Sequence, residues 1–86
     1  MDEKTLEKLL KVLANKRRIM ILKLLKDRSM SVVEIATKIK LSFRATSRHL
    51  SILSAQDILD REQISLQVFY KLSKSIPEIV SKILSA

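Results

Sequence analysis

Four side chains that can donate hydrogen bonds recur at helical spacing in the middle of the chain. They are Arg44, Ser47, Arg48 and Ser51. Positions i, i+3, i+4 and i+7 lie on one face of a helix, so these guanidinium and hydroxyl groups would project together. Arginine can bind guanine O6 and N7 through two hydrogen bonds, and serine can bond to bases or phosphates. The pattern favours contact with a DNA major groove over a merely solvated helix face.

Three neighbours of this stripe are further candidates for DNA contact. Ser42 is a favoured N-cap residue at the start of the helix. Thr46 can donate its hydroxyl to a base or a phosphate, although it also shares the inward stripe of Leu50 and Leu53. Phe43 falls on the first exposed turn, where contact with a thymine methyl and packing against the turn or wing are equally good explanations. We include all three in the expected DNA surface.

A second helix must precede this one and hold it in place. Ser31 and Glu34 have the spacing of a capping box, in which each side chain accepts a hydrogen bond from a backbone amide. Behind this cap, apolar residues at helical spacing predict one buried face. They are Val32, Ile35, Ala36 and Ile39. Lys40 falls in the turn and is a candidate for a strained conformation, because the sequence contains no glycine. The two segments together predict a helix-turn-helix.

Two helices are predicted before this unit. An amphipathic helix spans about residues 2–14, and a central, largely buried helix follows the cap residue Asn15. Lys16 and Arg17 occupy the start of the second helix, where positive charge opposes the helix dipole. Phosphate contact would explain these residues, and chance surface charge would explain them equally well.

A hairpin and a last helix are predicted after the unit. Beyond residue 56 the apolar period changes to two, which predicts two strands joined by a turn near residues 63–65. Arg61 and Gln63 in this hairpin are available to reach a phosphate or the minor groove. Pro77 should then be the first residue of the final helix.

Several of these segments resemble a known family. Leu41 and Ser42, leading into the run from Thr46 to Leu50, are similar to the recognition helix of ArsR-family winged helix-turn-helix repressors of prokaryotes. Residues 13–19 and 68–72 resemble that family's entry into its second helix and its returning wing strand. The resemblance implies a mainly α fold with a small β-hairpin, in the order α-α-α-α-β-β-α. It also implies a sequence-specific regulator of transcription, expected to be a dimeric repressor.

Two departures from that family change what is expected here. Ser65 occupies the wing turn, where the family commonly has glycine, so we expect a slightly longer or looser wing. Many members sense metals through cysteine pairs or through Asp and His on the last helix. This chain has no cysteine, and its last helix has neither His nor Asp, so we expect no metal site and no cofactor. The single histidine, His49, is expected to be packed; a metal there would need Asp57 or Asp60.

Length and charge limit the remaining interpretations. With 86 residues the chain is expected to form one domain, residues 1–86, without the constellation of groups that an enzyme needs. The formal net charge is +8, from 17 Lys and Arg against 9 Asp and Glu. This balance favours a polyanionic partner, with double-stranded DNA first and an anionic membrane surface second. No apolar run reaches the length of a bilayer span, so we expect a cytoplasmic protein that does not act at a membrane.

The two terminal helices carry apolar stripes that predict a homodimer. These stripes comprise Leu6, Leu9, Leu10 and Leu13 in the first helix and Ile79, Val80, Ile83 and Leu84 in the last. They exceed what so small a core needs, and a symmetric dimer would match a palindromic site. The alternative function is a winged-helix module that binds another protein within a larger transcription assembly. The sequence does not identify a small-molecule effector.

Overall fold

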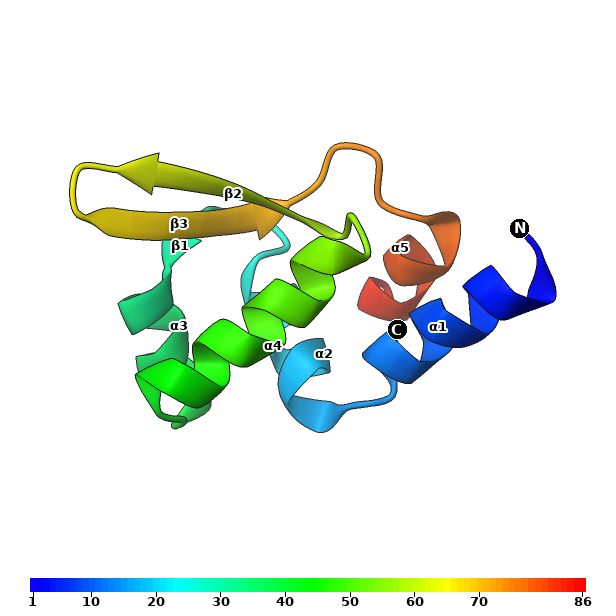
Figure 1. The fold of residues 1–86 in the computed structure, drawn as a ribbon, viewed down its shortest axis with the longest axis horizontal. Coiled ribbons are helices and arrows are strands. Elements are labelled where there is room, and N and C mark those ends of the chain that lie inside the picture. The colour runs from blue at the N-terminus through cyan, green and yellow to red at the C-terminus, as the bar shows by residue number, and fades with distance from the viewer.

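The computed structural model describes residues 1–86, which form five helices and a three-stranded antiparallel sheet (Figure 1). In chain order the elements are α1 (Glu3–Leu13), α2 (Lys16–Leu24), β1 (Met30–Ser31), α3 (Val32–Ile39), α4 (Phe43–Ala55), β2 (Leu59–Ile64), β3 (Gln67–Leu72) and α5 (Glu78–Leu84). The predicted fold class is confirmed, and β1 is an addition to the predicted order. None of the helices is long and apolar enough to cross a membrane.

Side-chain caps fix the helix-turn-helix formed by α3 and α4. Ser31 Oγ accepts a hydrogen bond from the Glu34 amide at 3.1 Å, and Glu34 Oε1 accepts one from the Ser31 amide at 3.0 Å. The bond from the Ser31 amide also lowers the pKa of Glu34. In the turn Lys40 adopts the left-handed conformation, with φ 56° and ψ 51°. Ser42 Oγ then accepts a hydrogen bond from the Ala45 amide at 3.1 Å. The predicted capping box, turn residue and N-cap are all confirmed.

The wing is a tight hairpin whose turn lies later than predicted. β2 and β3 pair in register as far as Ile64 and Gln67, so only Ser65 and Leu66 form the turn. The turn predicted near residues 63–65 is displaced toward the C-terminus, and of those residues only Ser65 lies in it. The expectation of a slightly longer or looser wing is wrong, because the turn has two residues. Ser65 adopts φ 57°, the conformation that glycine would otherwise provide, and this allows the short connection.

A short strand outside the hairpin completes the sheet. The strand order is β1-β3-β2, and Met30 and Ser31 of β1 pair with Tyr70 and Phe69 of β3. Ser31 therefore belongs to the sheet and also caps α3. This shared residue joins the wing to the first helix of the helix-turn-helix, so the two cannot move independently without breaking strand pairing.

Aliphatic side chains from every helix form one core. Ile21 and Leu22 of α2, Ile35 of α3 and Leu50 of α4 are completely buried, and Val80 of α5 joins them. The contacts among α2, α3 and α4 hold α4 against the domain along one face. That anchoring leaves the opposite face of α4 free.

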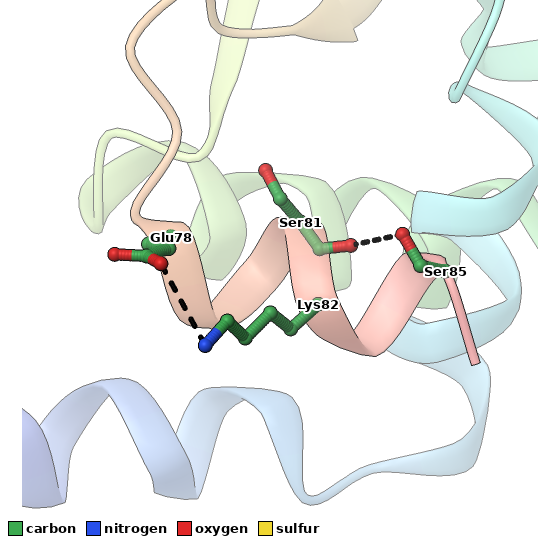
Figure 2. Close-up of polar contacts among 4 residues, drawn as sticks. All are labelled: Glu78, Ser81, Lys82 and Ser85. Carbon is green, nitrogen blue, oxygen red and sulfur yellow. Dashed lines mark hydrogen bonds and ion pairs between the residues drawn. The ribbon is translucent and has the colours of Figure 1, made fainter.

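The last helix is short and polar on its exposed side. Pro77 was predicted to be the first residue of α5. It is instead the N-cap, because the helix begins at Glu78. Figure 2 shows Lys82 Nζ within 3.6 Å of a Glu78 carboxylate oxygen. It also shows Ser85 Oγ donating a hydrogen bond to the Ser81 carbonyl at 3.0 Å. These exposed pairs contribute a few tenths of a kcal/mol each at most, so the core contacts of α5 hold it in place.

Candidate nucleic-acid interface

The donor stripe of α4 lies on the surface as the sequence predicted. Arg44, Arg48 and Ser51 are exposed, and Ser47 is half-buried beside them. On the opposite side Leu50 and Leu53 are completely buried. Because α4 contains no acidic residue, its two arginines face solvent without a carboxylate on the same helix. The arrangement presents cationic and hydroxyl donors from a helix that is anchored along its full length.

Thr46 does not belong to this surface. Its side chain is completely buried, with 0% exposed, and its hydroxyl has no hydrogen-bond partner. Thr46 lies one turn before Leu50 on the inward face of α4, so it packs with the core. The prediction that Thr46 contacts DNA is therefore corrected: a buried hydroxyl at this depth cannot reach a base or a phosphate.

Phe43 and Ser42 stand at the N-terminal end of α4. Phe43 is 58% exposed and lines the groove between α4 and the wing. Ser42 is exposed, but its hydroxyl already accepts the capping hydrogen bond from Ala45. Phe43 thus remains available to a partner, whereas Ser42 contributes chiefly by starting the helix at the correct residue.

The wing faces the donor stripe across this groove. Arg61 and Gln63 are exposed and occupy alternate positions of β2, so they share one face of the hairpin. Arg61 lines the groove opposite Ser47 and Ser51 of α4. The fold therefore brings together predicted contact residues that are at least ten positions apart in the chain.

The cationic start of α2 contains one free side chain and two engaged ones. Lys16 is exposed. Arg17 donates hydrogen bonds from its guanidinium to the carbonyl oxygens of Ile39 and Lys40, at the C-terminal end of α3. Arg18 donates from Nε to His49 Nδ1 at 3.2 Å and from a terminal nitrogen to the Val12 carbonyl at 3.0 Å. Sequence reasoning missed these bonds, because no local pattern pairs residues so far apart.

His49 is an acceptor inside the domain. Burial lowers the pKa of its imidazole, and the nearby charges of Arg18, Arg17 and Arg48 lower it further. The neutral ring accepts the Arg18 hydrogen bond through Nδ1. No group of three His, Cys, Asp or Glu side chains in the structure is arranged to hold a metal ion.

The predicted dimer residues fall into three sets. Leu9, Leu13, Val80 and Leu84 are 3%, 4%, 0% and 7% exposed. These four pack in the core of the single chain, which corrects their assignment to an outer surface. Leu6 and Leu10 are 36% and 42% exposed and line a shallow apolar groove along α1. Ile79 and Ile83 are partly buried against the core.

Comparison with known sequences identifies the family. The profile described as "Bacterial regulatory protein, arsR family" matches residues 15–61, which is more than half of the chain. The chain belongs to this family. The matched residues run from the cap of α2 through the helix-turn-helix to Arg61 in the wing.

Proteins similar to this arsR-family chain include named regulators. The transcriptional activator HlyU of Vibrio cholerae is 39% identical over 67 residues, which cover 78% of this chain and 62% of HlyU. The solved structure of HlyU from Vibrio cholerae N16961 has a TM-score of 0.83 at 32% identity, covering 99% of this chain and 91% of that one. NolR from Sinorhizobium fredii has a TM-score of 0.84 at 33% identity, covering 95% and 79%.

A more distant solved structure shares the fold. The Mycobacterium bovis protein Mb0332, described as a homodimeric winged helix-turn-helix DNA-binding domain, has a TM-score of 0.80 at 24% identity. The alignment covers 95% of this chain and 73% of that one. The winged helix-turn-helix architecture is therefore shared along nearly the whole of this chain.

Proposed function

We propose that this arsR-family chain is a sequence-specific regulator of transcription that binds double-stranded DNA. The observation that carries the proposal is the exposed stripe of Arg44, Arg48 and Ser51 on a helix whose other face is fully buried. A helix held in this way can enter a major groove, where arginine can hydrogen-bond to guanine and serine to bases or phosphates. The net charge of +8 adds a general attraction to the phosphate backbone.

Different residues are proposed to position the protein and to read the sequence. Lys16, in α2, and Arg61, in β2, are exposed cations. We assign both to contacts with phosphates. Arg44 and Arg48 are assigned to base edges, and Phe43 to a thymine methyl. Phosphate contacts release condensed counterions, so affinity should fall steeply as salt is raised.

The active form is proposed to be a homodimer that pairs the α1 helices. Leu6 and Leu10 supply the exposed apolar surface, and Mb0332 is described as homodimeric. Two recognition helices related by a two-fold axis would enter successive major grooves about 34 Å apart. We predict that binding represses transcription, in contrast to HlyU, which is named an activator. Such a function requires access to the chromosome, so we expect the protein in the cytoplasm.

Selection from a random duplex pool tests this function. Rounds of binding and elution should converge on a sequence with two related half-sites. In a shift assay the selected duplex should bind far more tightly than a scrambled one at the same salt. Recovery of an unenriched pool, with equal affinity for both duplexes, would refute sequence-specific binding. Binding to an acidic protein in place of DNA would instead support the interaction-module alternative.

A further inference from the structure

The tip of the wing presents an unusually exposed leucine. Leu66 is 95% exposed, more than any other large hydrophobic residue of the chain. Hairpin turns ordinarily use Gly, Asn, Asp or Ser, each for a conformational or hydrogen-bonding reason that leucine does not meet. Nothing within the chain covers this side chain, so the fold itself gains little from it.

The wing holds this leucine in a fixed place. β2 and β3 are paired along all six residues of each strand, and the last pair, Ile64 with Gln67, directly flanks the turn. Ser65 and Leu66 are the only unpaired residues between the strands. Figure 1 shows this turn projecting past the N-terminal end of α4 at the left of the view. A short turn on a fully paired ribbon presents Leu66 with little freedom to withdraw.

Leu66 also lines the groove between α4 and the wing. The lining of that groove includes Leu66 and Arg61 from the wing and Phe43, Ser47 and Ser51 from α4. A DNA duplex that lies along the exposed face of α4 would therefore meet the wing at its tip. Ile64, the other exposed apolar residue near the tip, is 51% exposed and does not line the groove.

We propose that Leu66 is an apolar wedge that enters the minor groove beside each half-site and partly unstacks one base-pair step. This inference rests on the proposed DNA-binding function. Leucine cannot bond to the acceptors of the minor groove, but apolar wedges of this kind insert between base steps and bend the duplex. Gln63, on the Arg61 face of the hairpin, supplies an amide that can donate to A·T pairs.

The wedge would add specificity at a position without hydrogen-bonded contacts. Pyrimidine–purine steps such as TA and CA unstack most easily, so sites with such a step under the wing should be preferred. The cost of opening the step would be offset by closer contact between the bent duplex and the domain. Selected sites should therefore share a flexible step outside the bases read by α4.

The wedge can be tested with the selected duplex carrying 2-aminopurine at the step next to the half-site. This base brightens when it unstacks, and a donor–acceptor pair at the duplex ends reports bending. Binding of the wild-type dimer should raise the fluorescence and bend the duplex. Leu66→Ser should remove both signals and weaken binding on the order of tenfold, while Leu66→Met should retain them. Ile64→Ser, a matched apolar loss on the other face of the tip, should leave both signals unchanged.

Four results would overturn the wedge. Wild-type binding to straight DNA with quenched 2-aminopurine would refute it while leaving the proposed function intact. Equal signals from Leu66→Ser and the wild type would do the same. A change in the dimerisation constant of Leu66→Ser, without any change in DNA geometry, would show that the tip contacts protein. Failure of the wild type to prefer any duplex would refute the proposed function itself, and the wedge with it.

Discussion

Arg17 and Lys16 are adjacent cations, but the structure predicts opposite consequences when each is replaced by alanine. The Arg17 guanidinium satisfies the carbonyl oxygens of Ile39 and Lys40, where α3 ends and the turn into α4 begins. A hydrogen bond from a charged group to a neutral acceptor contributes about 1.5–3 kcal/mol. Lys40 is exposed and water can replace one bond, so we expect Arg17→Ala to cost about 1–2 kcal/mol.

Lys16 has no such partner and stands at the start of α2. Its positive charge opposes the helix dipole there, and alanine is a better helix former. Lys16→Ala should leave the free energy of unfolding unchanged or raise it by a few tenths of a kcal/mol. Loss of the Lys16 side chain should appear only as weaker binding to all DNA sequences and as a smaller salt dependence of that binding.

Urea unfolding, monitored by circular dichroism, measures the free energy of unfolding of each variant, and thermal scans provide a second estimate. For a domain of this size 1–2 kcal/mol corresponds to a fall in melting temperature of roughly 5–15 °C. Arg17→Lys is the matched control, because it keeps the charge and loses the planar group that reaches two carbonyls. It should lose most of the same stability. If Arg17→Ala has the wild-type urea midpoint and binds DNA more weakly, then Arg17 contacts a phosphate, and the proposal that it stabilises the turn is refuted.

Four further substitutions test the stability of the domain and its assembly. Lys40→Gly should stabilise the domain by about 0.5–1 kcal/mol, since glycine accepts the left-handed conformation without strain; a lower urea midpoint would contradict this. The pKa of His49 is lower in the folded chain than the ordinary value of 6.5, so between these two pKa values the unfolded chain binds more protons. The free energy of unfolding should therefore be greatest above pH 6.5 and decline as pH falls through the folded pKa. His49→Gln should flatten this decline in urea midpoints measured between about pH 8 and 5, and an unchanged profile would assign it to other groups. Leu10→Lys should give a folded monomer in sedimentation, whereas Leu9→Ala should cost roughly 2–5 kcal/mol of stability; a dimeric Leu10→Lys protein would exclude the α1 interface.

Local signals in the sequence were sufficient for much of the helix-turn-helix. The capping box of Ser31 and Glu34, the N-cap Ser42 and the strained turn residue Lys40 each depend on contacts within a few positions of the chain. The absence of glycine made Lys40 a candidate, because some residue had to take the left-handed conformation. Helical spacing also separated the exposed Arg44 and Arg48 from the buried stripe.

Features that depend on distant contacts were not predictable in the same way. β1 has only two residues, too few for any alternation, and is defined by its pairing with β3. Arg17 finds its carbonyl partners more than twenty positions away, so its charge alone suggested a surface role. Leu66 lies within the stretch of period-two apolar spacing, and only the pairing of β2 with β3 places it in the turn. The apolar stripe of α1 could not reveal which leucines face the core and which remain outside.

The central claim is that the exposed face of α4 reads DNA sequence, and one binding measurement tests it most directly. Titrations at fixed salt would compare the wild type, Arg48→Ala and Lys82→Ala on the selected duplex and on a scrambled duplex. Arg48→Ala should lose about 1–3 kcal/mol on the selected duplex and relax the preference at one base pair. Lys82→Ala removes the same charge from α5, where Lys82 pairs with Glu78, and should retain that preference. Wild-type affinity and unchanged sequence preference for Arg48→Ala would contradict the claim.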